Sequence, residues 1–82
     1  MSTPDPPYTV DGLAAGRRVR LLAVDGDRSL RRRLMELGLL PGTLLRLVRR
    51  VAVGNLVELE VRGTLVSLRL AEARRLRVEP AE

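Results

Sequence analysis

Residues 29–43 carry the only complete helix pattern in this chain, and they lie between segments that alternate like β-strands. Leu30, Leu34 and Leu37 recur at i, i+4 and i+7, a spacing that places them on one face of a short helix. That apolar face predicts burial against a core, whereas the opposite face is polar and free for other contacts. Because the flanking segments are short and strand-like, the pattern favours a mainly β fold with one inserted helix.

Both ends of the predicted helix carry recognisable signals. Ser29, with Asp27 close before it, can cap the free amides of the first turn. Gly38 can adopt the left-handed conformation that ends a helix without a Cβ penalty. In the Leu-Pro-Gly-Thr sequence at 40–43, the proline and Gly42 occupy the positions that a type II turn prefers. The helix is therefore predicted to stop at Gly38, and the chain to reverse direction at Gly42.

Three consecutive arginines, Arg31, Arg32 and Arg33, lie near the start of this helix. Cations are unfavourable at the positive end of a helix dipole, by about 0.3–1 kcal/mol. A local rule broken in this way can mark a functional surface. Arginine is also a good helix former, and Glu36 with the nearby aspartates can balance the charge. The sequence leaves both interpretations open, a binding face and a solvated face.

The composition excludes several kinds of chemistry. A chain of 82 residues has room for one small domain with one core. It contains no cysteine and no histidine, which excludes disulfides, thiolate chemistry and the usual general base and metal ligand. Its serines have no histidine to activate them, and it has no glycine-rich phosphate loop. We therefore expect no enzyme activity, no catalytic or metal-binding residues and no cofactor.

Charge and hydropathy narrow the possible partners only in part. The net charge of +5 comes from 15 arginines, and such a surface can meet nucleic acid, an acidic protein face or an anionic membrane surface.

The apolar runs are far shorter than the ~20 residues needed to span a bilayer, and the start of the chain has no signal-peptide pattern. The expected location is the cytoplasm, without membrane insertion.

The remaining segments predict a small antiparallel barrel. Residues 1–7, with three prolines, predict a disordered leader, and residues 8–80 a single domain in which Leu13 plugs the barrel from below. Strands are expected at Arg18–Val24, Leu44–Val51, Leu56–Val61, Thr64–Arg69 and 76–79, with a helical turn at 70–74. The predicted fold class is mainly β: a small SH3-like antiparallel barrel of about five strands, with one short helix between the first two strands and a helical turn before the last. An OB fold is the structural alternative.

Alternation along these strands separates an inner from an outer face. The positions expected to face inward are Val19, Leu21, Ala23, Val57, Leu59, Val61, Val66 and Leu68. Gly63 lies in a two-residue hairpin turn that favours a positive φ. Leu65 falls on the outer face, so it is an apolar residue that the core pattern does not use.

With these segments assigned, the sequence resembles the FeoA family, small cytoplasmic proteins of bacterial ferrous-iron uptake. Relatives of this family also occur as carboxy-terminal SH3-like domains of iron- and manganese-responsive repressors. The resemblance covers nearly the whole chain. The residues that carry it are Leu13 with Gly16, the Arg-Arg-Leu-Met-Glu-Leu-Gly-Leu run at 32–39, Pro41-Gly42-Thr43, Val61-Arg62-Gly63, Leu68-Arg69, Glu72-Ala73, Leu76 and Val78.

The resemblance implies an SH3-like barrel that works beside FeoB, the membrane transporter with a cytosolic GTP-binding domain. It does not imply iron binding by this chain, which agrees with the missing histidine and cysteine. No DNA-binding helices precede the barrel, so we expect a free-standing accessory protein rather than a repressor. The leading hypothesis is an interaction module that docks on the cytosolic part of FeoB and modulates ferrous-iron transport.

The candidate partner-binding surface combines the outer face of the helix with the apolar residues that follow it and the isolated leucine of the outer strand face. Its residues are Arg31, Arg32, Arg33, Glu36, Leu39, Leu40, Pro41 and Leu65. The alternative for Leu39 and Leu40 is that they cover the mouth of the barrel. Gly38, Gly42 and Gly63 are expected to act only as structural turns.

A nucleic-acid-binding small barrel is the second hypothesis, because SH3-like and OB scaffolds both host such sites. Proteins that bind single strands stack bases on aromatic side chains, and Tyr8 is the sole aromatic residue of this chain. Binding of nucleic acid is therefore not expected. Heparin or RNA retention that collapses at moderate salt would distinguish this hypothesis from docking on a protein.

The absence of histidine and cysteine generates the first prediction. The isolated protein should hold no ferrous iron at micromolar metal concentrations, because it offers only scattered carboxylates as ligands. Anaerobic calorimetry with Fe²⁺ measures this directly. A stoichiometric, saturable heat would contradict the interpretation as an adaptor that binds no metal.

Overall fold

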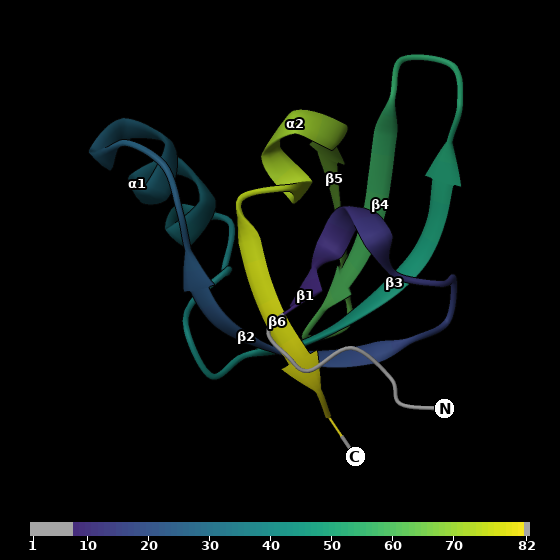
Figure 1. Cartoon of the computed structure of the whole chain (residues 1–82), viewed down its shortest axis with the longest axis horizontal. Coiled ribbons are helices and arrows are strands. Elements are labelled where there is room, and N and C mark those ends of the chain that lie inside the picture. Colours follow the sequence, from purple (N-terminus) through teal and green to yellow (C-terminus); the bar gives the residue numbers. More distant parts are fainter. Residues whose placement is uncertain (1–7, 82) are drawn as a thin grey trace.

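Six antiparallel strands form one sheet that curls into a small SH3-like barrel, with the helices set against it (Figure 1). The computed structural model describes residues 8–81. The elements in chain order are β1 (Tyr8–Thr9), the 3-10 helix η1 (Val10–Gly12), β2 (Arg18–Val24), α1 (Arg28–Glu36), β3 (Leu44–Val51), β4 (Leu56–Val61), β5 (Thr64–Arg69), α2 (Leu70–Ala73) and β6 (Leu76–Pro80). The strand order is β1-β6-β2-β3-β4-β5, so β1 and β5 are the two edges of a partly open barrel.

The predicted fold class is confirmed, and β2 to β5 have the predicted bounds. The sheet has six strands rather than about five, because Tyr8 and Thr9 pair with Val78 and Arg77 of β6. A two-residue strand is too short to show alternation, so the sequence carried no signal for it. The predicted leader, residues 1–7, lies outside the described residues.

The core is built from leucine and valine on the inner face of the sheet. In β4, Val57, Leu59 and Val61 are buried as predicted, while Glu58 and Glu60 between them are less so. Burying each such aliphatic side chain contributes about 1.5–3 kcal/mol, which allows a small core without aromatic residues. The buried apolar residues are Val10, Leu13, Val19, Leu21, Leu34, Leu39, Leu45, Leu47, Val57, Leu59, Val61, Val66, Leu68, Ala73, Leu76 and Val78.

One inward position in β2 differs from the prediction. The pairing of β2 with β6 shifts register between Leu21 and Ala23, a bulge that interrupts the alternation. As a result Val24, rather than Ala23, packs against the core. Leu22, which lies within the bulge, is partly exposed. Strict alternation cannot anticipate such a shift, because a bulge changes the side-chain phase by one residue.

The start of α1 is set by Asp27, not Ser29. The backbone amide of Leu30 donates a hydrogen bond to Asp27 Oδ1 at 2.8 Å, and Ser29 lies inside the first turn. Aspartate is as good an N-cap as serine, and its charge suits the positive end of the helix dipole. The helix therefore begins at Arg28, two residues earlier than a cap at Ser29 allows.

The end of α1 is a Schellman motif centred on Gly38. The Gly38 amide donates to the Met35 carbonyl at 2.9 Å, and the Leu39 amide donates to the Leu34 carbonyl at 3.1 Å. Gly38 has a φ of +96°, as predicted for the residue that ends the helix. The motif folds Leu39 back into the core, where it has no exposed surface. Leu37, predicted to lie on the core face, is instead 46% exposed, because the helix ends one residue before it.

The two predicted tight turns are present. The Thr43 amide donates to the Leu40 carbonyl at 3.0 Å and Gly42 has a φ of +92°, as a type II turn requires. In the β4–β5 hairpin, Gly63 has the predicted positive φ of +80°. Arg62 also has a positive φ, +53°, which makes this a type I′ turn and matches the twist of the strands.

The amino-terminal segment is held under the barrel. Leu13 is buried, as predicted for the plug. One guanidinium nitrogen of Arg50, from β3, donates to the carbonyls of both Asp11 and Leu13. Arg74, just after α2, forms a 3.5 Å ion pair with the Asp11 carboxylate. Within residues 8–81, none of the helices is long and apolar enough to cross a membrane.

The positive φ values of Gly38 and Gly63 generate the second prediction. Replacing either residue with alanine should lower the free energy of unfolding by about 1–2 kcal/mol, because a Cβ is strained in the left-handed region. A Cβ at Gly38 would meet Val61 only at 3.7 Å and one at Gly63 would meet nothing, so crowding adds little. Gly12→Ala is the matched control, because Gly12 has no positive φ and also has open space around it. Urea unfolding measures the three variants, and equal midpoints would contradict the turn assignments.

Candidate functional site

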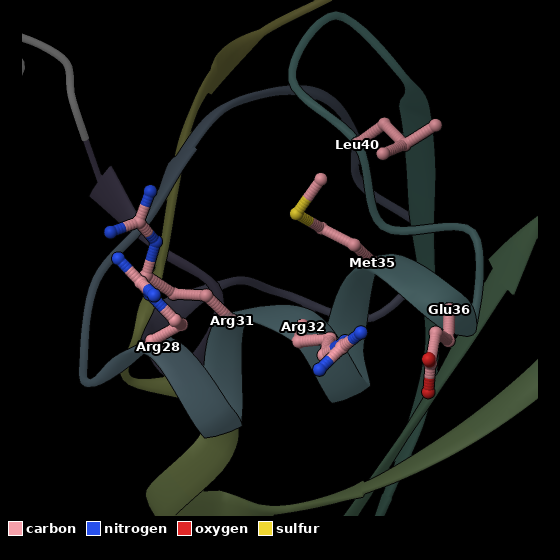
Figure 2. A pocket seen from close by; sticks show the side chains of 6 residues that line it. All are labelled: Arg28, Arg31, Arg32, Met35, Glu36 and Leu40. Carbon is pink, nitrogen blue, oxygen red and sulfur yellow. The ribbon is translucent and has the colours of Figure 1, made fainter.

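The outer face of α1 forms a shallow groove together with the turn that follows the helix. Its lining residues are Arg28, Arg31, Arg32, Met35, Glu36 and Leu40 (Figure 2). The five helical residues are spaced at i, i+3, i+4, i+7 and i+8, so they share one face of the helix. This face is opposite to Leu34, which is buried in the core. The core contacts of α1 therefore hold the groove toward solvent.

The centre of the groove is apolar. Met35 is 45% exposed, and its side chain extends between the arginines and Leu40 (Figure 2). Leu40 is partly buried at the start of the type II turn. Methionine is flexible and polarisable, which lets it adapt to a partner side chain. A single apolar side chain from another molecule can contact both residues.

The charges in the groove have no partners within the described chain. Among residues 8–81, carboxylates within 4 Å pair with Arg33, Arg46, Arg49, Arg74 and Arg77. No such pair involves Arg28, Arg31 or Arg32, all of which are exposed, or the nearby Glu36. The groove therefore combines three uncompensated cations with one anion.

On the outer face of the sheet, by contrast, two arginines of β3 are matched by glutamates of β4. Arg46 Nε donates to Glu60 Oε1 at 2.9 Å, and Arg49 Nε donates to Glu58 Oε1 at 2.5 Å. The hydrogen bond to Glu58, and then its charge, raise the pKa of the Arg49 guanidinium. Cross-strand pairs of this kind neutralise both charges and leave little charge for an external partner.

The structure brings together four of the predicted surface residues: Arg31, Arg32, Glu36 and Leu40. Arg33 points to the other side of α1, where it forms an ion pair with Glu72 of α2. This contact joins the two helices and directs Arg33 away from the groove.

The other three predicted surface residues lie outside the groove. Leu39 is wrong as a surface residue, because the Schellman motif buries it completely. Pro41 is exposed in the type II turn but does not line the groove. Leu65 is 62% exposed on β5, opposite Glu60 of β4, and belongs to the outer face of the sheet. The predicted partner-binding surface is therefore divided between the groove on α1 and the outer face of the sheet, where Leu65 lies.

Two residues of the groove were missed by the sequence analysis, Arg28 and Met35. Arg28 lies three and four residues before the two outward arginines, and Met35 follows them by the same spacing. The helical period that identified the leucine face therefore also identifies this second face. A helix capped by Ser29 begins at Leu30, two residues too late to include Arg28.

Among residues 8–81, no three histidine, cysteine, aspartate or glutamate side chains lie close enough together to hold a metal ion. The groove itself offers guanidinium groups, one carboxylate and two apolar side chains. These groups can bind and orient another molecule through charge and apolar contact.

Comparison with known proteins identifies the family. A family model described as the FeoA domain matches residues 8–80, nearly the whole chain. The chain belongs to the FeoA family. The resemblance seen in the sequence is thereby confirmed. No curated protein matches this FeoA chain in sequence.

Solved structures agree with this assignment. The FeoA protein from Chlorobium tepidum is 32% identical, with a TM-score of 0.84 over 92% of this chain and 71% of that protein. A FeoA-like protein from Clostridium acetobutylicum is 23% identical, with a TM-score of 0.83 over 96% of this chain and 92% of that protein.

The fold also occurs in larger proteins. A manganese-dependent transcriptional repressor in complex with manganese has a TM-score of 0.85 over 95% of this FeoA chain, which spans only 38% of the repressor. At 19% identity, this likeness concerns the fold alone.

The different burial of Leu39 and Leu65 generates the third prediction. Leu39→Ala should lower the free energy of unfolding by about 2–5 kcal/mol, because it leaves a cavity in the core. Leu65→Ala, the matched control on the outer sheet face, should change it by no more than about 0.5 kcal/mol. Urea or thermal unfolding compares the two variants. Similar small losses for both would contradict the burial of Leu39.

Proposed function

We propose that this chain is an accessory protein of ferrous-iron uptake that docks on the cytosolic part of the FeoB transporter. Membership in the FeoA family supports involvement in ferrous-iron transport. The observation that carries the docking proposal is the groove on α1, where three uncompensated arginines surround an exposed methionine. The proposed location is the cytoplasm, beside the transporter's GTP-binding domain.

The composition of the groove is typical of a protein-binding surface. Arginine and methionine are enriched in protein interfaces, and binding energy concentrates where an apolar centre is surrounded by a polar rim. Here the centre is Met35 with Leu40, and the rim is made by Arg28, Arg31 and Glu36. Docking there leaves the barrel undisturbed, because the opposite face of α1 supplies the core contacts.

The proposed role is regulatory rather than catalytic. A bound accessory protein changes its partner's activity only by binding one conformation of that partner more tightly than another. Docking on a nucleotide-dependent domain provides such a difference when the docking face changes between its states. Modulation of transport then follows from the preference of this chain for one of those states.

Nucleic acid binding has weaker support. Tyr8, the sole aromatic residue, lies on β1 and does not line the groove. Glu36 places a negative charge within the groove, where it would repel a phosphate. An acidic protein surface meets the arginines without requiring base stacking.

The fourth prediction tests the docking face. In the double variant Arg31→Gln/Arg32→Gln, association with the purified cytosolic domain of FeoB should slow about tenfold at low ionic strength and lose much of its salt dependence. Stability should change by no more than about 0.5 kcal/mol, because both side chains are exposed and unpaired. Stopped-flow or surface-based kinetics at several salt concentrations measure the effect.

A matched control separates local contact from overall charge. Arg17→Gln/Arg18→Gln removes the same net charge from two exposed arginines away from the groove, the residue just before β2 and the first residue of that strand. This control should retain most of the wild-type association rate. Equal slopes of rate against ionic strength for all three proteins would remove the α1 face from the interface.

A further inference from the structure

The groove on α1 has a defined order of chemical groups. Along the helix come Arg28, then Arg31 and Arg32, then Met35 with Glu36 beside it. At a rise of 1.5 Å per residue, the first cation and the methionine are separated by about 10 Å along the axis. Figure 2 shows the guanidinium groups of Arg28 and Arg31 on one side of Met35 and the Glu36 carboxylate on the other. Two cations therefore lie at one end of the groove and an anion at the other, with the Arg32 guanidinium between them in the same view.

We infer that this groove binds an acidic amphipathic helix of the partner protein, an inference that rests on the proposed docking function. Carboxylates of that helix pair with Arg28 and Arg31, and one apolar side chain contacts both Met35 and Leu40. A lysine or arginine one turn further lies near Glu36. The matching pattern is an acidic residue at i, a second at i+3 or i+4, an apolar residue at i+7 and a basic residue at i+10 or i+11.

A helix fits this position better than an extended segment. The backbone groups in the middle of α1 are bonded within the helix, so the groove offers no free edge for strand pairing. An extended peptide lying there would leave its own backbone groups without protein partners. A helix satisfies its backbone internally and presents side chains at the spacing that α1 itself uses.

The charges also distinguish the partner from other occupants. A second copy packed face to face on this groove would bring six arginines and only two glutamates into one contact, so repulsion between like charges outweighs the pairs that Glu36 can form. A uniformly anionic surface, such as a lipid headgroup layer or a nucleic acid backbone, leaves Glu36 facing negative charge. A surface with both signs, separated by an apolar side chain, complements the arginines, the apolar centre and Glu36 at the same time.

The fifth prediction uses the full-length protein labelled with ¹⁵N and a synthetic helical peptide of about 16 residues that carries the pattern above. The peptide should shift the amide signals of Arg28 to Leu40 with a dissociation constant below about 1 mM. Met35→Gln should weaken binding about tenfold. Replacing the peptide's apolar residue with serine should have a similar effect. No shift at millimolar peptide would overturn the inference.

Charge reversal in the groove tests whether the arginines pair with the acidic residues of the peptide. Arg28→Glu/Arg31→Glu should abolish binding of the acidic peptide and restore binding of a peptide in which the two acidic residues are lysines. The same reversal at Arg17 and Arg18 is the control and should leave the acidic peptide bound. Anionic vesicles and single-stranded RNA are tested in the same way. If one of them shifts the amide signals of α1 and the peptide does not, the inferred helix is wrong and that class of molecule is the partner.

A parallel titration with the cytosolic domain of FeoB separates this inference from the proposed function. If that domain binds but shifts only amide signals outside the groove, the proposal of docking on FeoB is supported and the inference of an acidic helix in the groove is contradicted. If the peptide binds and the domain does not, the inference that the groove binds an acidic helix is supported and FeoB is the wrong partner. Shifts of the same amides by both, abolished by the same charge reversal, support both proposals.

Discussion

The Schellman motif at Gly38 is the interaction on which the arrangement of the molecule depends. Its two hydrogen bonds turn the chain sharply at the end of α1, so that Leu39 enters the core that already contains Leu34. These two leucines attach the helix to the barrel from one side. The opposite face, with its arginines and Met35, is consequently directed outward. The geometry of the groove thus follows from a backbone conformation that glycine adopts readily and that other residues adopt at a cost.

The pairing of arginines with carboxylates determines where positive charge remains on the surface. Fifteen arginines on 82 residues would make a uniformly basic protein, but carboxylates on the sheet and on α2 neutralise several of them. Arg33 illustrates the principle, since its pairing with Glu72 separates it from the arginines beside it in sequence. What remains on α1 is a local field from three arginines that line one groove and have no carboxylate partner among residues 8–81. The other arginines without such a partner in that part of the chain, among them Arg17, Arg18 and Arg62, lie elsewhere on the surface. Local fields of this kind direct a partner to one orientation, whereas net charge alone affects mainly encounter and solubility.

The barrel is shared with proteins of a different kind. A FeoA protein and a manganese-dependent repressor superimpose on this chain almost equally well, although only the former is similar enough in sequence to show the family. A scaffold of short strands around an aliphatic core tolerates many surfaces, because the outward residues contribute little to its stability. The function of this chain therefore has to be sought in the residues that the fold leaves unpartnered, and the α1 groove holds a concentrated set of them.

The sequence by itself determined the fold class, the bounds of four strands and the positions of the turns, because side-chain alternation, glycine and proline act over a few residues. It also placed Arg31 and Arg32 on an outward face. Only the tertiary structure decided that Leu39 rather than Leu37 enters the core, and that Arg33 pairs with α2 while its neighbours stay free. Local pattern placed the end of the helix at Gly38, but it did not show which side chains the distant elements of the barrel and α2 bring close to α1. Those contacts join residues far apart in the chain.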